Sequence, residues 1–355
     1  MDRDLGDWKW QIANRISTRE QLEEYIELTD EERSAFEGEI PLSFAVTPHY
    51  ARLMKHDALR RTVIPTQHEK CTGTGELADP LGEELHRATP HLIHTYPDKV
   101  LFLVTTFCST YCRYCTRSRL VGKHPMDFQT LEESFCYIEE HSEIRDVLIS
   151  GGDPLTITDS VLDGILTRLR SIPHVRMVRI GSKVPVVLPM RISDDLCSML
   201  RRHRVWLSLH FIHAAELSPE TREACRKLAD YGIGMVSQTV LLRGVNDNTE
   251  ALVDLFYGLL EINVKPYYLL QCDPVQGSAH FRTSVQKGIE LIQSLHGRVS
   301  GLAVPQYVID APGGGGKVQI LDRAQLRREG DEVIFLNHEG QEYRYPDPRL
   351  TSDIS

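Results

Sequence analysis

The sequence contains no apolar run long enough to cross a membrane, and its N-terminus lacks the basic start and apolar core of a signal peptide. We therefore expect a cytoplasmic protein with no membrane partner. Positive charge is also scarce, because 40 Lys and Arg residues stand against 50 Asp and Glu residues, for a formal net charge of −10. This balance excludes the broad basic face that nucleic-acid binding requires, and it favours a small-molecule substrate.

Cysteines are few, and most of them are scattered, so a disulfide framework is not expected. Five are single and are expected mostly to fill the core, namely Cys71, Cys136, Cys197, Cys225 and Cys272. The other three, Cys108, Cys112 and Cys115, form a C-x3-C-x2-C loop directly after the apolar segment 100–104. Thiolates select iron–sulfur or zinc, and three of them leave one coordination position for another ligand.

The residues of this loop do not by themselves decide which metal it binds. A zinc knuckle with a distant fourth ligand, such as His124, is one interpretation, and three merely buried thiols are another. Tyr114, just before the last cysteine, completes a pattern that resembles the cluster loop of the radical S-adenosylmethionine (SAM) enzymes. The resemblance implies that Cys108, Cys112 and Cys115 bind a 4Fe-4S cluster whose fourth iron binds SAM, with Tyr114 beside these cofactors.

The hydrophobic pattern divides the chain into three parts. Residues 1–95 show helical spacing and then a Thr-, Gly- and Pro-rich connection from 64 to 90, which predicts a helical N-terminal extension followed by a surface segment. Residues 96–312 alternate strand-like and amphipathic runs. Residues 313–355 contain a glycine loop and then alternating residues, which predict small β-hairpins packed on the preceding part.

The middle part is expected to form a parallel α/β sheet, because parallel strands need crossover connections and buried strands are almost continuously apolar. The strand-like runs lie at 100–106, 146–150, 175–181, 205–211, 233–242 and 264–271. The amphipathic stretches lie at 127–141, 158–171, 193–202, 219–231, 248–261 and 284–296. Periodicity alone does not exclude a doubly wound sheet. The radical SAM resemblance implies a partial (βα)6, TIM-like barrel.

Polar groups follow several of these strands, where the catalytic groups of parallel sheets lie. Gly151, Gly152 and Asp153 follow the second strand and resemble the glycine-rich turn that contacts the methionine amine of SAM. His210 ends the fourth strand and Gln238 lies on the fifth, and by resemblance they touch SAM or its neighbour. A plain turn and ordinary structural hydrogen bonds are the alternatives.

A second glycine run, 313–316, leads to Lys317. A phosphate-binding P-loop would need Gly at the position of Ala311 and Ser or Thr at that of Val318, so that interpretation fails. A flexible backbone ahead of one lysine favours an amine that reaches an aldehyde cofactor, pyridoxal phosphate (PLP). A linker with an incidental lysine is the alternative.

The cysteine loop and the run Asp310-Ala-Pro-Gly-Gly-Gly-Gly-Lys317 together resemble the lysine 2,3-aminomutase family, which uses radical SAM chemistry and PLP. The resemblance extends through Trp8-Lys-Trp, Asp79-Pro-Leu, Tyr96-Pro-Asp, Ile172-Pro-His, Leu241-Leu-Arg-Gly-Val-Asn-Asp, Pro266-Tyr-Tyr and His280-Phe-Arg-Thr. It covers nearly the whole chain.

The resemblance assigns roles to individual residues. Lys317 would bind PLP covalently and be the catalytic lysine, Arg117 would bind the substrate α-carboxylate, and Asp273 and Asp310 would bind the distant ammonium group of lysine. An ordinary turn before Pro274 is the alternative for Asp273.

Two departures from the family pattern concern other positions. The arginines that bind the PLP phosphate in the family correspond here to Thr95 and Lys99, so we expect Lys99 to bind it. The C-terminal zinc-binding cysteines are missing, and Asn248 stands in place of the partner cysteine. We therefore predict no structural zinc and leave a homo-oligomer open.

The predicted function is a 2,3-amino shift between L-lysine and β-lysine through a 5′-deoxyadenosyl radical, with flavodoxin or ferredoxin as an electron donor. The alternatives are an aminomutase for another cationic amino acid, such as arginine, and a noncatalytic metal-binding scaffold. The prediction requires that the cysteine loop and Lys317 open into one cavity.

Overall fold

The structure is a computed structural model that describes residues 5–38, 42–122, 130–320, 326–330, 332–336 and 339–346. A ten-stranded sheet forms its centre, with the strands side by side in chain order. The strands are β1 Arg87–Thr89, β2 Leu92–Tyr96, β3 Lys99–Thr105, β4 Asp146–Gly151, β5 Met177–Ser182, β6 Trp206–His210, β7 Gly234–Leu241, β8 Lys265–Gln271, β9 Gln306–Ala311 and β10 Gly316–Gln319. β3 to β9 are parallel, and the flanking strands β1, β2 and β10 are antiparallel.

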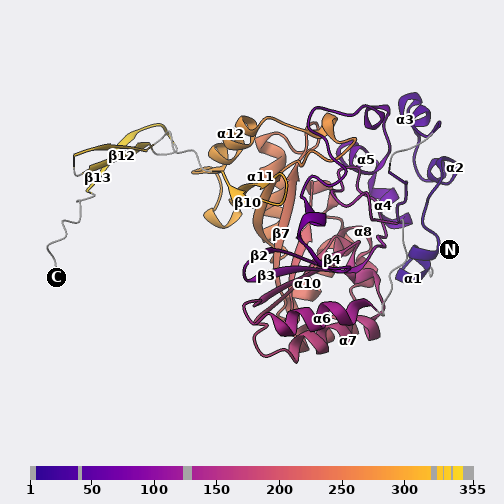
Figure 1. Cartoon of the computed structure of the whole chain (residues 1–355). Coiled ribbons are helices and arrows are strands. Elements are labelled where there is room, and N and C mark those ends of the chain that lie inside the picture. The colour runs from indigo at the N-terminus through magenta and orange to yellow at the C-terminus, as the bar shows by residue number, and fades with distance from the viewer. Residues whose placement is uncertain are drawn as a thin grey trace.

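One long helix follows each of the strands β3 to β8. These helices are α6 Leu131–Glu140, α7 Asp159–Arg170, α9 Asp194–Arg202, α10 Pro219–Asp230, α11 Thr249–Leu260 and α12 Val285–Leu295. Because such crossovers are right-handed, a strand order without reversal places every helix on the same face, and the sheet curls with the helices outside (Figure 1). The six predicted units are therefore confirmed. The sheet is an open partial barrel, and its strand order excludes the doubly wound alternative.

Alternation along the strands separates the two faces of the sheet. In β7, Met235, Ser237, Thr239 and Leu241 are buried, whereas the residues between them are only partly buried. Gln238 is one of these partly buried residues and lines the cavity described below. The outer face packs under the helices in the main core, and the inner face is left partly open for a site.

Among its described residues, the N-terminal extension has five short α-helices, which lie together at the right of Figure 1. They are α1 Trp8–Ala13, α2 Arg19–Glu23, α3 Asp30–Ala35, α4 Pro48–Leu53 and α5 Asp57–Val63. The end of the segment from 64 to 90 differs from the expected surface connection, because β1 lies in it and pairs with β2 at the edge of the sheet. None of the described helices is both long and apolar enough to span a bilayer.

Side chains connect the two ends of the curved sheet. At the end of β2, the Tyr96 hydroxyl accepts a hydrogen bond of 2.6 Å from the backbone N–H of Lys317 on β10. The tyrosine ring also lies against Gly316, where an added Cβ would be 2.9 Å from it. The sheet is thus bridged between its ends by a seam of side-chain contacts around Tyr96, without backbone pairing between β2 and β10.

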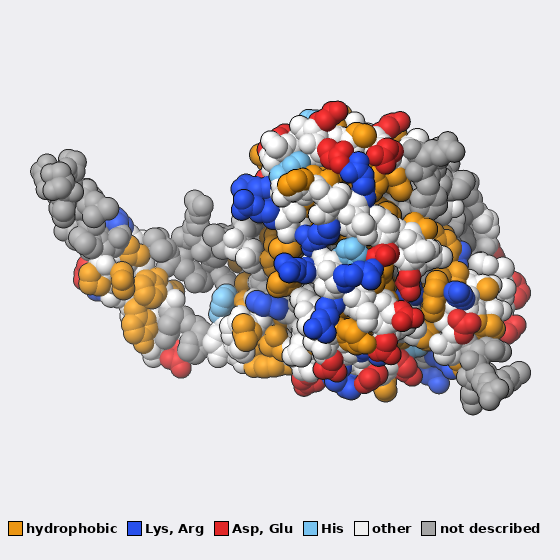
Figure 2. Space-filling view, turned by 90° about the horizontal axis from the view of Figure 1, so that it is seen from below, with side chains coloured by type: hydrophobic (Ala, Val, Ile, Leu, Met, Phe, Trp, Pro, Cys, Tyr) orange, Lys and Arg blue, Asp and Glu red, His pale blue; other side chains and the backbone are white. Residues whose placement is uncertain are grey.

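The C-terminal strands form a separate antiparallel sheet of β11 Leu326–Glu329, β12 Glu332–Leu336 and β13 Glu342–Pro346. The predicted hairpins therefore exist, but this sheet stands to the side of the barrel in Figure 1 instead of packing on it. Figure 2 shows exposed hydrophobic side chains on this small sheet, at the left of the view. Those exposed are Phe335, Leu336, Tyr343 and Tyr345.

Candidate active site

One cavity of about 540 Å³ is lined by residues from along the parallel strands, from Lys99 and Asp146 at the starts of β3 and β4 to the loops that follow the carboxyl ends. The cysteine loop and Lys317 both line it, as the prediction required. All the predicted site residues contribute to its wall, namely Lys99, Cys108, Cys112, Tyr114, Cys115, Arg117, Gly151, Gly152, Asp153, His210, Gln238, Asp273, Asp310 and Lys317. Thr95 lines it as well.

The N-terminal extension fixes the cysteine loop in place. The Arg15 guanidinium donates a 2.6 Å hydrogen bond to the Cys108 carbonyl and lies over the Phe107 ring. Farther along the loop, the Arg113 guanidinium forms a fully buried ion pair with Glu69. The loop geometry therefore depends on residues far upstream in the sequence.

The three thiols are held in a way that suits a metal cluster. Burial raises the pKa of Cys108, Cys112 and Cys115, the last to about 11, and the charge of Cys112 raises the pKa of Cys115 further. The thiolate forms therefore need a strongly cationic partner. Within the described residues, no three His, Cys, Asp or Glu side chains are placed to hold one metal ion. Thiolates that bind separate irons of a cluster need not meet at one ion. His124 lies outside the described residues.

Glycines after β4 allow the backbone to approach the cysteine loop. Gly152 lies so close to it that an added Cβ would be 2.2 Å from the Phe107 carbonyl oxygen. Gly151 has φ +122°, and its added Cβ would be 2.1 Å from the Thr105 oxygen. The Asp153 N–H also donates to the Phe107 carbonyl at 2.8 Å. The glycine turn and the cysteine loop therefore form one tightly packed unit.

The Asp153 carboxylate is already occupied by internal donors. It accepts hydrogen bonds from the Ser182 hydroxyl at 2.7 Å and from the backbone N–H groups of Lys183 at 2.7 Å and Leu155 at 3.1 Å. Burial raises the pKa of Asp153, and these donors oppose the change. These hydrogen bonds brace the turn, and the contact of this carboxylate with the SAM amine stays a prediction.

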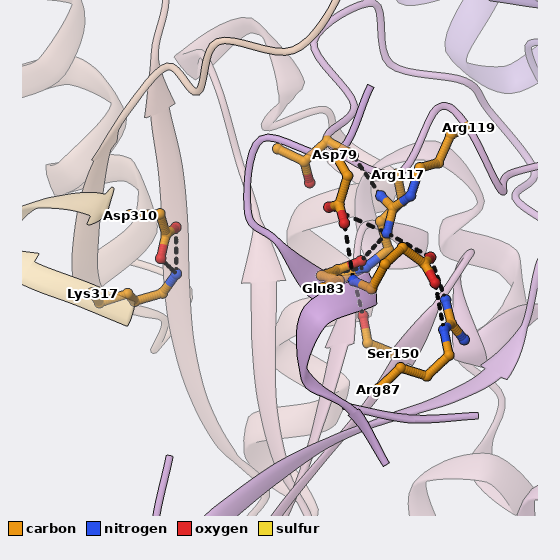
Figure 3. Close-up of polar contacts among 10 residues, drawn as sticks. Asp79, Glu83, Arg87, Arg117, Arg119, Ser150, Asp310 and Lys317 are labelled. Atoms are coloured by element: carbon orange, nitrogen blue, oxygen red, sulfur yellow. Dashed lines mark hydrogen bonds and ion pairs between the residues drawn. The ribbon is translucent and has the colours of Figure 1, made fainter. Parts of the chain in front are cut away.

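Arg117 projects from the loop after the last cysteine and is held by an acidic residue that the sequence analysis had not singled out. Its Nε donates to Glu83 Oε1 at 2.8 Å, and its Nη1 donates to the Ser150 hydroxyl at 3.2 Å (Figure 3). Glu83 also binds Arg119 at 3.0 Å. Although burial opposes it, these two guanidinium groups lower the pKa of Glu83, so it is ionised.

Lys317 and Asp310 form an ion pair at the other side of the cavity. They face each other across the β9–β10 hairpin, with Nζ 2.8 and 2.7 Å from the two carboxylate oxygens (Figure 3). Asp273 follows β8 on the same side. Burial and the neighbouring Asp310 charge raise the pKa of Asp273 to about 7, and Lys317 opposes the change. The carboxylates of Asp310 and Asp273 thus both lie near the Lys317 ammonium group.

The remaining predicted residues lie between these two groups. His210 and Gln238 are register partners on β6 and β7. Burial, and then the charges of Lys183, Arg117 and Lys317, lower the pKa of His210 to about 4, so the imidazole is neutral. Gln238 Nε2 donates to the Ser208 hydroxyl at 2.5 Å.

Tyr114 and Lys99 also line the cavity. Burial and the Cys112 thiol raise the pKa of Tyr114. The Lys99 ammonium lies 4.8 Å from the centre of the Tyr96 ring, on the side of the cavity near Lys317.

Comparisons with known proteins agree with this arrangement. Family models match residues 102–256 as the radical SAM superfamily and residues 292–353 as lysine-2,3-aminomutase. The L-lysine 2,3-aminomutase of Clostridium subterminale is 45% identical over 98% of this chain and 85% of its own length. The chain belongs to the lysine 2,3-aminomutase family.

The chain is also similar to a relative with a different substrate name and to a solved structure. The glutamate 2,3-aminomutase of Clostridioides difficile is 38% identical over 98% of this chain and 84% of its own length. A crystal structure of a radical SAM methyltransferase from Sphaerobacter thermophilus is 17% identical, with a TM-score of 0.45 over 63% of this chain and 72% of that chain.

Family membership makes the protein a radical SAM isomerase and implies a 4Fe-4S cluster, SAM and PLP. The residues that line the cavity suit these groups: three partly buried thiols on one loop, a glycine turn beside them, and Lys317 on the side of Asp310. Sequence reasoning missed Arg15, Glu83 and Tyr96 as parts of the site. Glu83 and Tyr96 lie in or beside the Asp79-Pro-Leu and Tyr96-Pro-Asp segments that carried the resemblance, which was the signal available for them.

Proposed function

We propose that the protein interconverts L-lysine and β-lysine by a 2,3-amino shift. The observation that carries the proposal is the separation of charges in one cavity. A guanidinium, Arg117, lies on the cysteine-loop side, and two carboxylates, Asp273 and Asp310, lie on the side of Lys317. An amino acid with a cationic side chain presents the complementary pattern.

The two carboxylates favour lysine over glutamate as the substrate. Covalent attachment of PLP would take the Lys317 amine out of its ion pair with Asp310, so both acids would then lack a cation. The ammonium group of a bound lysine restores it, whereas a glutamate side chain would be repelled. The glutamate 2,3-aminomutase relative makes this charge pattern the specific test of the substrate.

The residues of this chain would position and seclude the reaction. Cys108, Cys112 and Cys115 would hold the cluster, and Lys317 would hold PLP. When bound, the cluster and SAM supply a 5′-deoxyadenosyl radical and PLP supplies the carbonyl group that carries the migrating nitrogen. A flavodoxin or ferredoxin would deliver the electron.

The direct test is formation of β-lysine from L-lysine under strict anaerobiosis with SAM, PLP and a reductant. A panel with L-arginine and L-glutamate separates the substrate alternatives by charge, and conversion of glutamate but not lysine would overturn the proposal.

The lysine assignment has a separate chemical test. Borohydride reduction of the PLP-loaded protein should leave a stable label on Lys317, as read by peptide mass. Lys317→Ala should abolish both the label and turnover, whereas the exposed Lys55→Ala control should retain both. Turnover by Lys317→Ala would contradict the assignment.

A further inference from the structure

Glu83 lies at the start of a short turn, η2 Glu83–His86, which covers the cavity beside Arg117. Its side chain is 5% exposed, and its two oxygens are divided between two arginines. Oε1 binds Nε and Nη2 of Arg117 at 2.8 and 2.7 Å, and Oε2 binds Nη2 of Arg119 at 3.0 Å (Figure 3). Arg119 is held in turn by Asp79 at 3.3 Å.

These contacts fix the rotation of the Arg117 guanidinium. A guanidinium has a side edge, formed by Nε and one Nη, and a far edge formed by the two Nη atoms. Glu83 occupies the side edge, and the Ser150 hydroxyl takes one N–H of Nη1 at 3.2 Å. Each Nη atom keeps one N–H group beyond these bonds, so two donors remain with which Arg117 can bind a carboxylate.

We propose that Glu83 is a positioning residue that presents the far edge of Arg117 to the substrate α-carboxylate. This inference rests on the proposed function and extends it to a residue that does not itself touch the substrate.

The same turn also contacts the loop that leads to Lys317. An added Cβ on Gly82 would be 2.7 Å from the Gly313 backbone, and one on Gly314 would be 2.2 Å from the His86 ring. The turn therefore touches both the arginine that would hold the carboxylate and the loop of the lysine that would hold PLP. Its position sets the spacing between the two ends of the site.

Simple electrostatics and positioning predict opposite effects of removing the Glu83 charge. If Glu83 only offset the charge of Arg117, Glu83→Gln would strengthen the binding of a carboxylate. If Glu83 positions Arg117, the amide weakens that binding, because a glutamine has one acceptor oxygen for two arginines and turns an N–H donor toward one of them.

The experiment compares L-lysine with 1,5-diaminopentane, which is lysine without its α-carboxylate. Both are titrated calorimetrically into the PLP-loaded protein without SAM or reductant, so no turnover occurs. In Glu83→Gln we expect the affinity for L-lysine to fall about ten- to hundredfold, the range for losing a charge-assisted hydrogen bond. The affinity for the diamine should stay within about twofold, because Arg117 does not contact it.

Matched variants make each outcome decisive. Glu84→Gln makes the same charge change in the same turn, but Glu84 binds Arg87 and Arg119 and not Arg117, so its lysine affinity should match the original protein. Unchanged or tighter lysine binding in Glu83→Gln, or equal loss of both ligands, would overturn the inference. Should Glu83→Gln not fold, Glu83→Asp is tested against the same criteria. If the unsubstituted protein binds neither ligand, the proposed function fails instead.

Discussion

Replacing Asp273 by asparagine should make the ligand-free protein more stable at alkaline pH while impairing its function. Burial and the charge of Asp310 raise the pKa of Asp273 from 3.8 to about 7. A carboxyl whose pKa is higher in the folded state than in the unfolded state binds its proton more tightly when folded. The original protein therefore loses stability as the pH rises from about 4 through about 7. Asparagine has a similar shape and does not ionise, so the variant escapes this loss.

The size of the effect follows from the pKa difference. About three pH units at about 1.4 kcal/mol each give at most about 4 kcal/mol of extra unfolding free energy for Asp273→Asn above the folded-state pKa. Partial exposure and the nearby Lys317 ammonium reduce this, and we expect about 1–3 kcal/mol at about pH 8. Near about pH 4 both proteins carry a neutral side chain, and the difference should vanish.

Urea unfolding of the ligand-free proteins at these two pH values measures the difference. Asp310→Asn is the control, because its carboxylate binds Lys317 through both oxygens, at 2.8 and 2.7 Å, and its loss should lower stability. The same Asp273→Asn protein should bind L-lysine at least about tenfold more weakly, since one carboxylate partner of the ammonium group is lost. A variant that is less stable than the original at both pH values would refute the reasoning, because the Asp273 carboxylate would then be satisfied in the folded protein.

Two further predictions concern the cysteine loop. Gly152→Ala should lower the iron and sulfide content after anaerobic reconstitution, because its Cβ would stand 2.2 Å from the Phe107 oxygen and push the loop away. Gly164→Ala, whose Cβ would meet nothing within 4 Å, should bind the cluster normally, and equal iron contents would contradict the argument. Glu69→Gln should lower the unfolding free energy by about 3–5 kcal/mol, because it leaves the Arg113 charge buried without its partner. Urea unfolding measures this loss, adding Arg113→Met should recover part of it, and a loss below about 1 kcal/mol would show that the pair is not needed.

The six strand–helix units could be predicted from the sequence because their signals are local. Buried parallel strands are continuously apolar, and several helices begin at a capping residue, as α10 does at Ser218 and α11 at Asn248. Asn248 accepts a hydrogen bond of 2.9 Å from the Ala251 N–H. The residue that stands in place of the family's partner cysteine therefore has a structural role of its own.

The edges of the sheet could not be predicted, because their strands are short and held by distant partners. β1 and β2 carry little alternation, and the glycine run hid β10, which pairs with β9 across the Asp310–Lys317 turn. The Arg117–Glu83 pair joins residues 34 positions apart, and no local pattern predicts such an ion pair. Asp153 is predicted to contact the SAM amine because it follows a strand. The sequence does not reveal that its carboxylate accepts hydrogen bonds from Ser182 and Lys183.

The seam at Tyr96 is the part of the cavity wall that we expect to need the least free energy to open. Separating neighbouring parallel strands would break several backbone hydrogen bonds. Parting β2 from β10 breaks the hydrogen bond between the Lys317 N–H and the Tyr96 hydroxyl, worth about 1 kcal/mol, together with the packing of Tyr96 on Gly316 and of the η2 turn on Gly313 and Gly314. Because it has no ladder of backbone hydrogen bonds, we expect this seam to open more readily than a boundary between neighbouring parallel strands. We therefore expect PLP to enter the cavity past this seam, directly beside Lys317.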